Sequence, residues 1–360
     1  MATKRVGILT SGGDCAGLNA VVRAATHAAL QKKWEIIGIK QGIYGLIHQP
    51  PQYVPLNYAF DGLGPALLRM GGTFLGTTNQ GDPFKIQMPD GTYQDKSDAF
   101  IRGYHSLELD ALIGIGGDGS LDKLRRLTLK GNIPFIGIPK TIDNDIGLTD
   151  SLGFETAVAV ATEALDRLQP TAASHSRVMI LEVMGRDAGH IALHAGIAGG
   201  ADVILIPEIP FLVEKILDHI NTIKKHGRNF SLIIIAEAAK PIDHSAVTHD
   251  DKKGYKRYGG IGQFLAEALE KHVSADVRAM ALGHVQRGGQ PVARDRLLAA
   301  AFGVHAIELI DAGKSDQMVA WQNRAVVSIP LEEGIASYEM VKKEGQMVRT
   351  ARGLGISFGD

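Results

Sequence analysis

The 360-residue sequence contains a single cysteine, Cys15, and few aromatic residues, which make up 6% of the chain. With one cysteine, the chain can form no internal disulfide and no metal site built from several thiolates. A lone thiol in a long chain is typical of a reducing compartment, so we expect a cytoplasmic protein. Cys15 itself has two interpretations: a redox-sensitive thiol near a helix N-terminus or, as we favour, a small buried residue.

The sequence also has no long hydrophobic run and no excess charge. Its most apolar segments, DVILIPEIPFLV and SLIIIAEAA, carry acidic residues and fall short of the roughly 18 apolar residues of a membrane span. The first residues show no basic segment followed by an apolar one, so no signal peptide is indicated. The formal net charge of −1 argues against a large nucleic-acid surface. We therefore expect a soluble globular protein that binds neither membrane nor nucleic acid.

Glycine, in contrast, is abundant: the chain has 43, which is about 12% of the residues against a typical value of about 7%. Glycine costs conformational entropy wherever the fold does not need it, so this excess requires a cause. The length suggests two domains at roughly 150 residues each, enough to bury substantial cores.

Short apolar runs alternate with helical patterns along most of the chain. Continuous runs that end at Gly or Pro, such as ALIGIGG and PFIGIPK, predict buried parallel strands. Helices are predicted over residues 17–31, 155–168 and 261–272. This alternation predicts two Rossmann-like, three-layer α/β domains with mostly parallel sheets. Residues 241–257 predict a mobile surface loop, and residues 339–360 are expected to begin as a helix.

Many glycines follow predicted strands and stand beside hydroxyl and acidic residues. Three clusters have this form, at residues 10–14, 71–79 and 114–120. Unhindered N–H groups near helix N-termini suit phosphate oxygens, and such loops lie at the carboxyl ends of strands, where α/β sheets bind ligands. The alternative is that these glycines only form tight turns between strands and helices, which would explain one such cluster more easily than three. None contains GxxxxGK[ST], so a P-loop NTPase is not indicated.

The segment PKTIDND, residues 139–145, follows another predicted strand and carries a lysine, a threonine and two aspartates. Such a density of polar groups is costly unless they are solvated, paired or used. If this segment and Asp118 share a crevice, one carboxylate can hold Mg²⁺ while another accepts a proton, as phosphoryl transfer requires. A cluster of Asx turns is the structural alternative.

Arginine and histidine recur in three short strings beside predicted strand ends: SHSR, MGR, and HVQRGG with the nearby Arg278. The guanidinium group is suited to bidentate capture of phosphate. A single arginine is usually a surface ion pair, but several at strand ends favour a sugar-phosphate clamp.

Taken in order, the strings TSGGDCAGLNA, GGTFLGT, GGDGS, PKTIDND, SHSR, VMGR, AEA and GHVQRGG closely resemble the 6-phosphofructokinase family. TIDND followed by GHVQRGG is far more specific than GGDG, which NAD kinases and lipid kinases resemble. The resemblance implies the phosphofructokinase fold and the transfer of phosphate from Mg-ATP to the 1-hydroxyl of fructose 6-phosphate, the committed step of glycolysis. It assigns residues 1–153 and 286–336 to a larger donor-binding domain, and residues 154–285 and 337–360 to a smaller sugar-phosphate domain.

The resemblance also implies roles for individual residues. Asp143 would be the general base for the sugar hydroxyl, and the catalytic group would also include Thr141, Arg186 and Gly13. Asp118 would associate with Mg²⁺. The donor site would comprise Gly13, Asn79, Gly117, Asp118, Gly119, Ser120 and Lys140. The sugar-phosphate site would comprise Thr141, Asp143, Arg177, Met184, Gly185, Arg186, Glu237, Arg278, His284 and Arg287. In this family Arg177 and Arg278 would reach a neighbouring subunit's site, which implies a homo-oligomer, usually a tetramer.

Two positions bear on the phosphoryl donor and disagree. Gly119 matches ATP-using members, whereas pyrophosphate users typically have an aspartate there, which would crowd and repel the α-phosphate of ATP. Lys140 matches pyrophosphate users. A flexible lysine can move aside more easily than a carboxylate, so ATP is expected and a pyrophosphate-dependent phosphotransferase is the alternative. Asn79 stands where many bacterial ATP users have an arginine that bridges the substrates, a role that the charge of Lys140 can partly replace.

Other readings of the motifs remain open. An NAD kinase shares GGDG but not TIDND, and a non-catalytic sugar-phosphate or nucleotide sensor would be expected to lack Asp143 or Asp118. Bacterial family members also bind nucleoside diphosphate or phosphoenolpyruvate between subunits. Basic residues are common there, and Arg23 fits that pattern, but this chain carries neutral or titratable residues at His27, Gln169 and His226. We therefore expect a weak or altered effector response.

Overall fold

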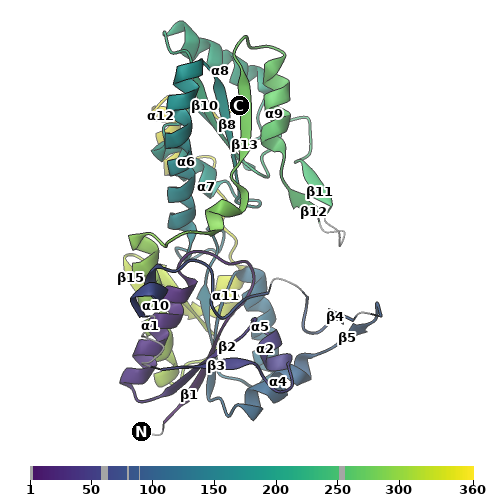
Figure 1. Cartoon of the computed structure of the whole chain (residues 1–360), viewed down its shortest axis with the longest axis vertical. Coiled ribbons are helices and arrows are strands. Elements are labelled where there is room, and N and C mark those ends of the chain that lie inside the picture. The colour runs from purple at the N-terminus through teal and green to yellow at the C-terminus, as the bar shows by residue number, and fades with distance from the viewer. Residues whose placement is uncertain (1–2, 58–63, 79–80, 89, 251–255) are drawn as a thin grey trace. The chain divides into compact units, whose positions relative to one another are not determined.

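The computed structural model describes residues 3–57, 64–78, 81–88, 90–250 and 256–360 (Figure 1). The chain divides into two compact units. Unit 1 comprises Met1–Thr141, Ile146–Glu155 and Arg287–Tyr338, and unit 2 comprises Ile142–Asp145, Thr156–Gln286 and Glu339–Asp360. No helix within the described ranges is both long enough and apolar enough to cross a bilayer.

Unit 1 is built on a seven-stranded sheet in the order β15-β14-β7-β6-β1-β2-β3. The parallel strands are β1 (Arg5–Thr10), β2 (Glu35–Ile39), β6 (Ala111–Gly116), β7 (Phe135–Pro139) and β14 (Gln317–Gln322). The antiparallel edge strands are β3 (Tyr53–Leu56) and β15 (Ala325–Pro330). Because β2 and β6 lie on opposite sides of β1, the loops after β1 and β6 meet at the switch point where open α/β sheets bind ligands.

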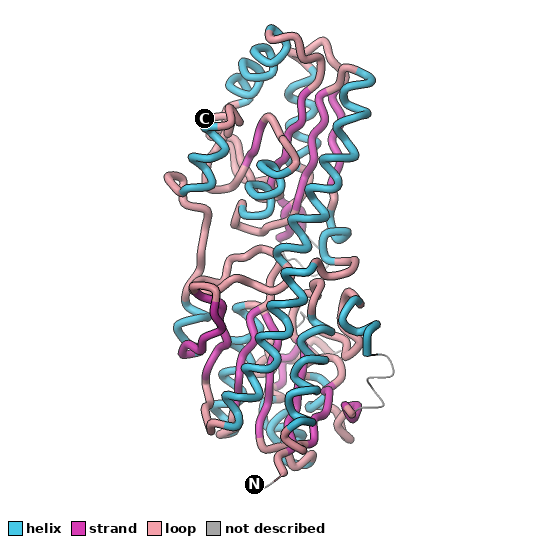
Figure 2. Tube along the Cα trace, turned by 90° about the vertical axis from the view of Figure 1, so that its left-hand side faces the viewer, coloured by secondary structure: helices cyan, strands magenta, loops and turns pink. Residues whose placement is uncertain are grey.

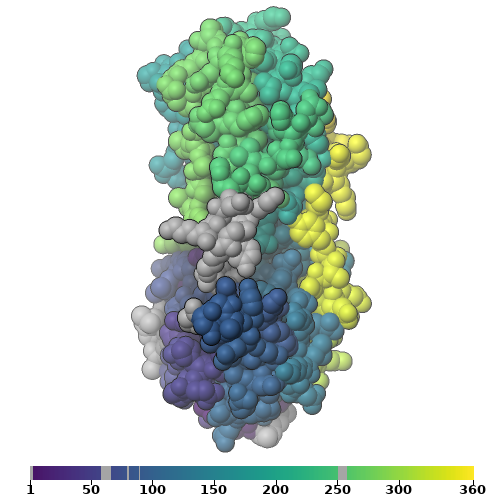
Figure 3. All heavy atoms as spheres, turned by 90° about the vertical axis from the view of Figure 1, so that its right-hand side faces the viewer, coloured from purple at the N-terminus to yellow at the C-terminus, as the bar shows by residue number. Residues whose placement is uncertain are grey.

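Helices cover both faces of this sheet (Figure 2). They are α1 (Leu18–Gln31), α2 (Tyr44–Ile47), α3 (Gly64–Arg69), α4 (Ser97–Ser106), α5 (Asp118–Gly131), α10 (Ala293–Asp311) and α11 (Leu331–Ala336). α1 packs tightly on α10, where a methyl group added at Gly303 would lie 2.7 Å from the carbonyl oxygen of Val21. The short strands β4 (Ile86–Gln87) and β5 (Tyr93–Gln94) form a hairpin in the blue region on the face of unit 1 shown in Figure 3.

Unit 2 contains a four-stranded, all-parallel sheet in the order β13-β8-β10-β9. Its strands are β8 (Val178–Val183), β9 (Val203–Leu205), β10 (Ser231–Ala236) and β13 (Val277–Ala281). Its helices are α6 (Phe154–His175), which starts in unit 1, α7 (His190–Ala198), α8 (Val213–Lys225), α9 (Ile261–Glu270), α12 (Gln346–Gly353) and the 3₁₀ helix η2 (Gly283–Arg287). Apolar residues of α8 and α9, such as Ile216 and Leu265, form one core with inward-facing residues of the strands, such as Ile180 and Ile233.

The predicted α/β architecture with mostly parallel sheets is confirmed, but three local predictions need correction. α6 continues past Pro170 to His175, because a proline inside a helix removes one backbone donor without having to end the helix. Residues 339–345 are not helical, and the N–H of Glu339 instead donates to the carbonyl of Asp145. The segment 241–257 is not only a loop: β11 (Thr248–Asp250) pairs with β12 (Lys256–Tyr258), while residues 251–255 lie outside the described ranges.

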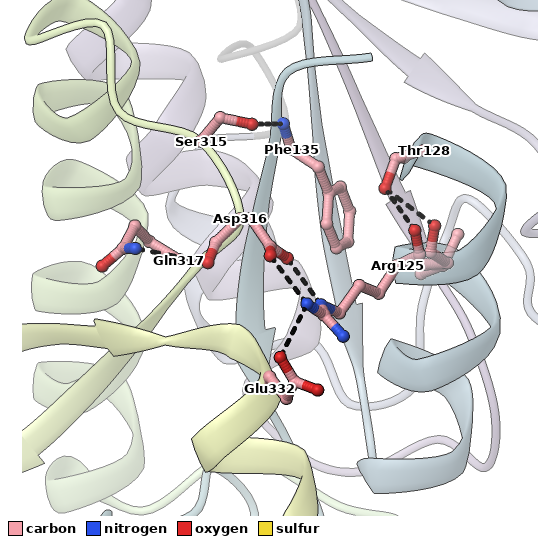
Figure 4. Close-up of polar contacts among 8 residues, drawn as sticks. Arg125, Thr128, Phe135, Ser315, Asp316, Gln317 and Glu332 are labelled. Carbon is pink, nitrogen blue, oxygen red and sulfur yellow. Dashed lines mark hydrogen bonds and ion pairs between the residues drawn. The ribbon is translucent and has the colours of Figure 1, made fainter. Parts of the chain in front are cut away.

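An ion-pair cluster of Arg125, Asp316 and Glu332, the Arg125 cluster, anchors α5, the helix that begins at the aspartate of the GGDG motif (Figure 4). Arg125 makes a bidentate ion pair with Asp316, at 2.8 and 3.0 Å, and its Nη2 also lies 3.1 Å from Oε2 of Glu332. Ser315 accepts the N–H of Phe135 at 3.1 Å, which ties the same segment to the start of β7. The two carboxylates raise the pKa of Arg125 above its already high ordinary value.

We expect Arg125→Ala to lower the free energy of unfolding by about 1–2 kcal/mol, because it leaves two carboxylates without their shared cation. Urea denaturation measures this change. Arg167→Ala is the matched control, since the Arg167 side chain is 77% exposed and pairs with Glu163, one turn away on the same helix α6. Equal stability losses in the two variants would contradict an anchoring role for Arg125.

Candidate active site

Three segments that are far apart in the sequence meet at the carboxyl edge of the unit 1 sheet. The loop after β1 is held by two backbone hydrogen bonds, from Ser11 to Ile115 and from Gly12 to Thr78. Gly12 has a positive φ of 88°, and a methyl group added there would lie 2.6 Å from Ser120 Oγ and 3.4 Å from Lys140 Nζ. The loop after β1, the first turn of α5 and the end of β7 therefore surround one small space.

The first turn of α5 combines an acidic residue with exposed backbone. Gly117 is the N-cap in an extended conformation, and Asp118 follows as the first helical residue, where a carboxylate is favoured by the helix dipole. Gly119 is exposed, and a methyl group added to it would meet no atom within 4 Å among the described residues, apart from its chain neighbours and the backbone of its own helix. Among the described residues, therefore, neither the backbone conformation of Gly119 nor a close neighbour requires glycine at this position.

Lys140 is almost fully buried, with 5% of its surface exposed, at the end of β7. Its backbone N–H donates to the carbonyl of Gly116 at 3.0 Å, which sets the lysine beside the end of β6. The ammonium group points to the loop after β1, as its distance to the Gly12 position shows. The structure therefore groups Lys140 with Ser120 and the glycine loop. Their assignment to a donor site stays a prediction.

Arg287 also lies against the loop after β1. Its Nη1 donates to the carbonyl of Asp14 at 3.0 Å and would lie 2.9 Å from a methyl group added at Gly13. The sequence placed Arg287 with His284 at the sugar phosphate, but this contact with the predicted donor loop was not foreseen. Asn79, which was also assigned to the donor site, lies outside the described residues.

In unit 2, the loop after β8 brings two of the predicted sugar-phosphate residues, Gly185 and Arg186, to Glu237. Oε1 of Glu237, which follows β10, accepts the N–H groups of Gly185 at 3.2 Å and Arg186 at 3.0 Å. Nε of Arg186 lies 3.8 Å from Oδ2 of Asp143, a carboxylate that is only 5% exposed, whereas the arginine side chain is 61% exposed. A buried acid thus faces an accessible cation at the carboxyl edge of this sheet.

Gln286 is a residue of this group that sequence reasoning missed. It is 1% exposed and its Oε1 lies 3.4 Å from the N–H of Met184, in a long hydrogen bond. The sequence carried a signal for this residue, because Gln286 lies inside the GHVQRGG string and a glutamine that becomes buried needs polar partners. His284, two residues earlier in η2, is exposed.

Arg177 and Arg278 lie at the opposite edge of the unit 2 sheet. Arg177 comes directly before β8, and Arg278 is the second residue of β13. Asp276 bridges them, with its carboxylate oxygens 3.0 Å from Nε of Arg177 and 2.8 Å from Nη2 of Arg278. Since strands β8 and β13 are parallel, both arginines stand at amino ends, a strand length away from Arg186.

The residues considered for effector binding lie on two helices or directly after a third. Arg23 and His27 belong to α1, Gln169 to α6, and His226 follows α8. The expected weak effector response stays a prediction.

Cys15 is fully buried in unit 1, and its Sγ points to the carbonyl of Leu152 at 3.5 Å. Burial raises the pKa of the Cys15 thiol to about 12, with the nearby charge of Lys140 opposing this shift. The neutral thiol is therefore the stable form at physiological pH. This environment is that of a small buried residue and does not favour a reactive thiolate.

We expect the native protein to react only slowly with a thiol-specific reagent at pH 8, because the thiolate is rare and covered. The same reagent should titrate one thiol per chain after denaturation, since Cys15 is the single cysteine. Absorbance of the released chromophore measures both. Rapid, complete reaction of the native protein would contradict the buried assignment.

Comparisons with known proteins identify the family of this chain and agree with its fold. The phosphofructokinase family model matches residues 5–310. Proteins named ATP-dependent 6-phosphofructokinase 1 from Nostoc sp. and Synechocystis sp. are 58% and 54% identical, each over 99% of both chains. The structure of phosphofructokinase from Saccharomyces cerevisiae matches with a TM-score of 0.78 at 29% identity, over 93% of this chain and 45% of that one. The pyrophosphate-dependent phosphofructokinase from Nitrosospira multiformis has a TM-score of 0.82, over 100% of this chain and 93% of that one, but is 21% identical and so shows only a shared fold. The chain belongs to the phosphofructokinase family.

Proposed function

We propose that this protein is an ATP-dependent 6-phosphofructokinase of glycolysis, which transfers a phosphoryl group from ATP to the 1-hydroxyl of fructose 6-phosphate. The observation that carries this proposal is the convergence of Gly12, Ser120 and Lys140 at the switch point of the unit 1 sheet. Relatives that bear this enzymatic name match almost the whole chain. A glycolytic enzyme with one buried thiol also fits the expected cytoplasmic location.

Unit 1 would bind the phosphoryl donor. Backbone N–H groups of the loop after β1 and of the first turn of α5 can receive phosphate oxygens, and the helix dipole adds attraction there. Lys140 and Arg287 add two cations beside the same loop. The donor residues Gly13, Gly117, Asp118, Gly119 and Ser120 would line this space, and Asn79 is proposed for it from the resemblance alone.

The residues present suit Mg²⁺ that arrives with a nucleotide. The described residues hold no group of three or more histidine, cysteine or carboxylate side chains fit for a metal. Mg²⁺ is commonly held by one or two carboxylates together with substrate phosphates, and Asp118 supplies such a carboxylate beside the proposed phosphate site. When bound, the metal would neutralise charge on the phosphates.

Unit 2 would bind fructose 6-phosphate at the loop after β8. Asp143 would accept the proton of the 1-hydroxyl, and Thr141, two residues earlier, would contact the transferred group. The cation of Arg186 offsets part of the cost of burying the Asp143 carboxylate and remains accessible to a phosphate. Met184, Gly185 and Glu237 would shape the sugar site, with His284 at its 6-phosphate end; Arg287, assigned there from the resemblance, touches the donor loop in this structure.

The position of Arg177 and Arg278 supports a homo-oligomer. Both stand at the amino edge of the unit 2 sheet, whereas Arg186 stands at the carboxyl edge. One chain cannot therefore bring all three to a single phosphate from within this sheet. A second copy that presents its own Arg177 and Arg278 would complete the site, and a tetramer with shared sites is the proposed assembly.

The alternative function is a pyrophosphate-dependent phosphotransferase acting on the same sugar, favoured by Lys140 alone. The deciding experiment measures fructose 1,6-bisphosphate formed from fructose 6-phosphate with either ATP or pyrophosphate, each with Mg²⁺. Turnover with ATP supports the proposal. Turnover with pyrophosphate and none with ATP would overturn the choice of donor.

We expect Asp143→Ser to lower kcat by several orders of magnitude while the KM for fructose 6-phosphate changes less. A general base acts mainly in the transition state, so its loss affects turnover more than binding. Steady-state kinetics with ATP and Mg²⁺ measure both constants. A variant with nearly normal turnover would refute the role of Asp143.

We expect Gly119→Asp to fold normally, because a side chain there meets open space, and to raise the KM for ATP at least about tenfold through repulsion of its phosphates. Gly119→Ala is the control for size without charge. Thermal denaturation checks the fold, and kinetics with ATP and with pyrophosphate check the donor preference. If the aspartate variant has the same KM for ATP as the wild type, Gly119 does not determine the choice of donor.

A further inference from the structure

The backbone turn that carries Arg186 is strained and is held from outside. Gly185 has a φ of 151° and Arg186 a φ of 50°, in the left-handed region that non-glycine residues seldom adopt. Glu237 accepts both of their N–H groups, and the N–H of Ala188 donates to the carbonyl of Gly185. Such a conformation persists only where its surroundings fix it.

A further contact reaches this turn from a different part of the chain. Tyr258, the last residue of β12, donates its hydroxyl to Oδ1 of Asp187 at 2.5 Å. The carboxylates of Asp187 and, less strongly, Glu237 raise the pKa of Tyr258 to about 12 together with partial burial. The hydroxyl therefore keeps its proton, and remains a donor, at any physiological pH.

Tyr258 is itself firmly placed. The two glycines that follow it have positive φ values of 147° and 89°, and the N–H of Gly260 donates to Oε1 of Glu182 at 3.0 Å. The other oxygen of this buried carboxylate accepts the N–H of Gly262 at the start of α9. Glu182 belongs to β8, the strand that leads directly into the Arg186 turn. Tyr258 is thus fixed to the same strand as the turn that it contacts.

The hydroxyl matters because it is bound to the residue next to Arg186. Glu237 holds the turn through the backbone N–H groups of Gly185 and Arg186, and Tyr258 holds it through the side chain of Asp187. The guanidinium of Arg186 lies near the Asp143 carboxylate, with Nε 3.8 Å from Oδ2. A turn fixed on both sides keeps the arginine directed to Asp143.

We propose that Tyr258 is a positioning residue for the sugar-phosphate site, because its hydroxyl holds Asp187 and thereby fixes the turn and the direction of Arg186. This inference rests on the proposed function, in which Arg186 contacts fructose 6-phosphate. It gives a role to Tyr258, a residue that belongs to none of the sequence motifs described above.

The test compares Tyr258→Phe with Tyr53→Phe, a tyrosine on the edge strand β3 that is 41% exposed. We expect Tyr258→Phe to raise the KM for fructose 6-phosphate about three- to tenfold and to leave the KM for ATP unchanged. Asp187→Ala should have the same effect, and the double variant should be no worse than either one. Asp187→Asn retains an acceptor oxygen and should restore most of the affinity. Tyr53→Phe should match the wild type.

Amide hydrogen exchange gives a readout that does not depend on activity. In the Tyr258→Phe protein, the amides of Gly185 and Arg186 should exchange faster than in the wild type. A wild type that forms no fructose 1,6-bisphosphate overturns the proposed function, while exchange still tests the positioning of the turn. Unchanged exchange and unchanged KM for the sugar, or equal changes in both KM values with a lowered Tm, would overturn the role of Tyr258.

Discussion

Backbone must approach closely where the loop after β1 meets the first turn of α5, and the rest of unit 1 depends on this constraint. A methyl group on Gly12 would collide with the Ser120 hydroxyl, and one on Gly13 would collide with the Arg287 guanidinium. The near-neutral net charge leaves little general attraction for a polyanion. Phosphate binding would then rely on N–H groups brought close together and on a few placed cations. Gly12 and Gly13 allow that close approach, and the Arg125 cluster holds α5 where the approach occurs.

In unit 2, backbone N–H groups bind carboxylates of the protein itself, of which Glu182 and Glu208 are buried and Glu237 is half-buried. Glu182 accepts two N–H groups at the start of α9, Glu208 accepts those of Gly189 and Val341 beside α7, and Glu237 accepts those of the Arg186 turn. Each carboxylate satisfies donors that a helix start or a sharp turn leaves unpaired. These acids therefore organise the loops at the carboxyl edge before any substrate is present, which is the pre-organisation that catalysis requires.

Patterns confined to one segment were predictable, and contacts between distant segments were not. Continuous apolar runs gave β6 and β7 because both faces of a parallel sheet are covered, and the glycine motifs located the loops after them. The bond from Tyr258 to Asp187 and the placement of Arg287 depend on how separate elements pack, which no local spacing encodes. The non-helical course of residues 339–345 follows from pairing with Asp145, again a distant partner. The assigned site roles stay predictions.

The apparent conflict between Gly119 and Lys140 becomes smaller once both are placed. Lys140 is nearly buried beside the loop after β1, so its charge would attract any phosphate bound there, whether from a nucleotide or from pyrophosphate. Gly119 faces open space at the exposed start of α5, so it would leave room for a donor that extends beyond the phosphates at the loop. In the proposed site, the lysine would add binding energy without selecting the donor, while the glycine would permit the larger one. A site with both residues is consistent with ATP, and the lysine charge suits a chain that has asparagine rather than arginine at position 79.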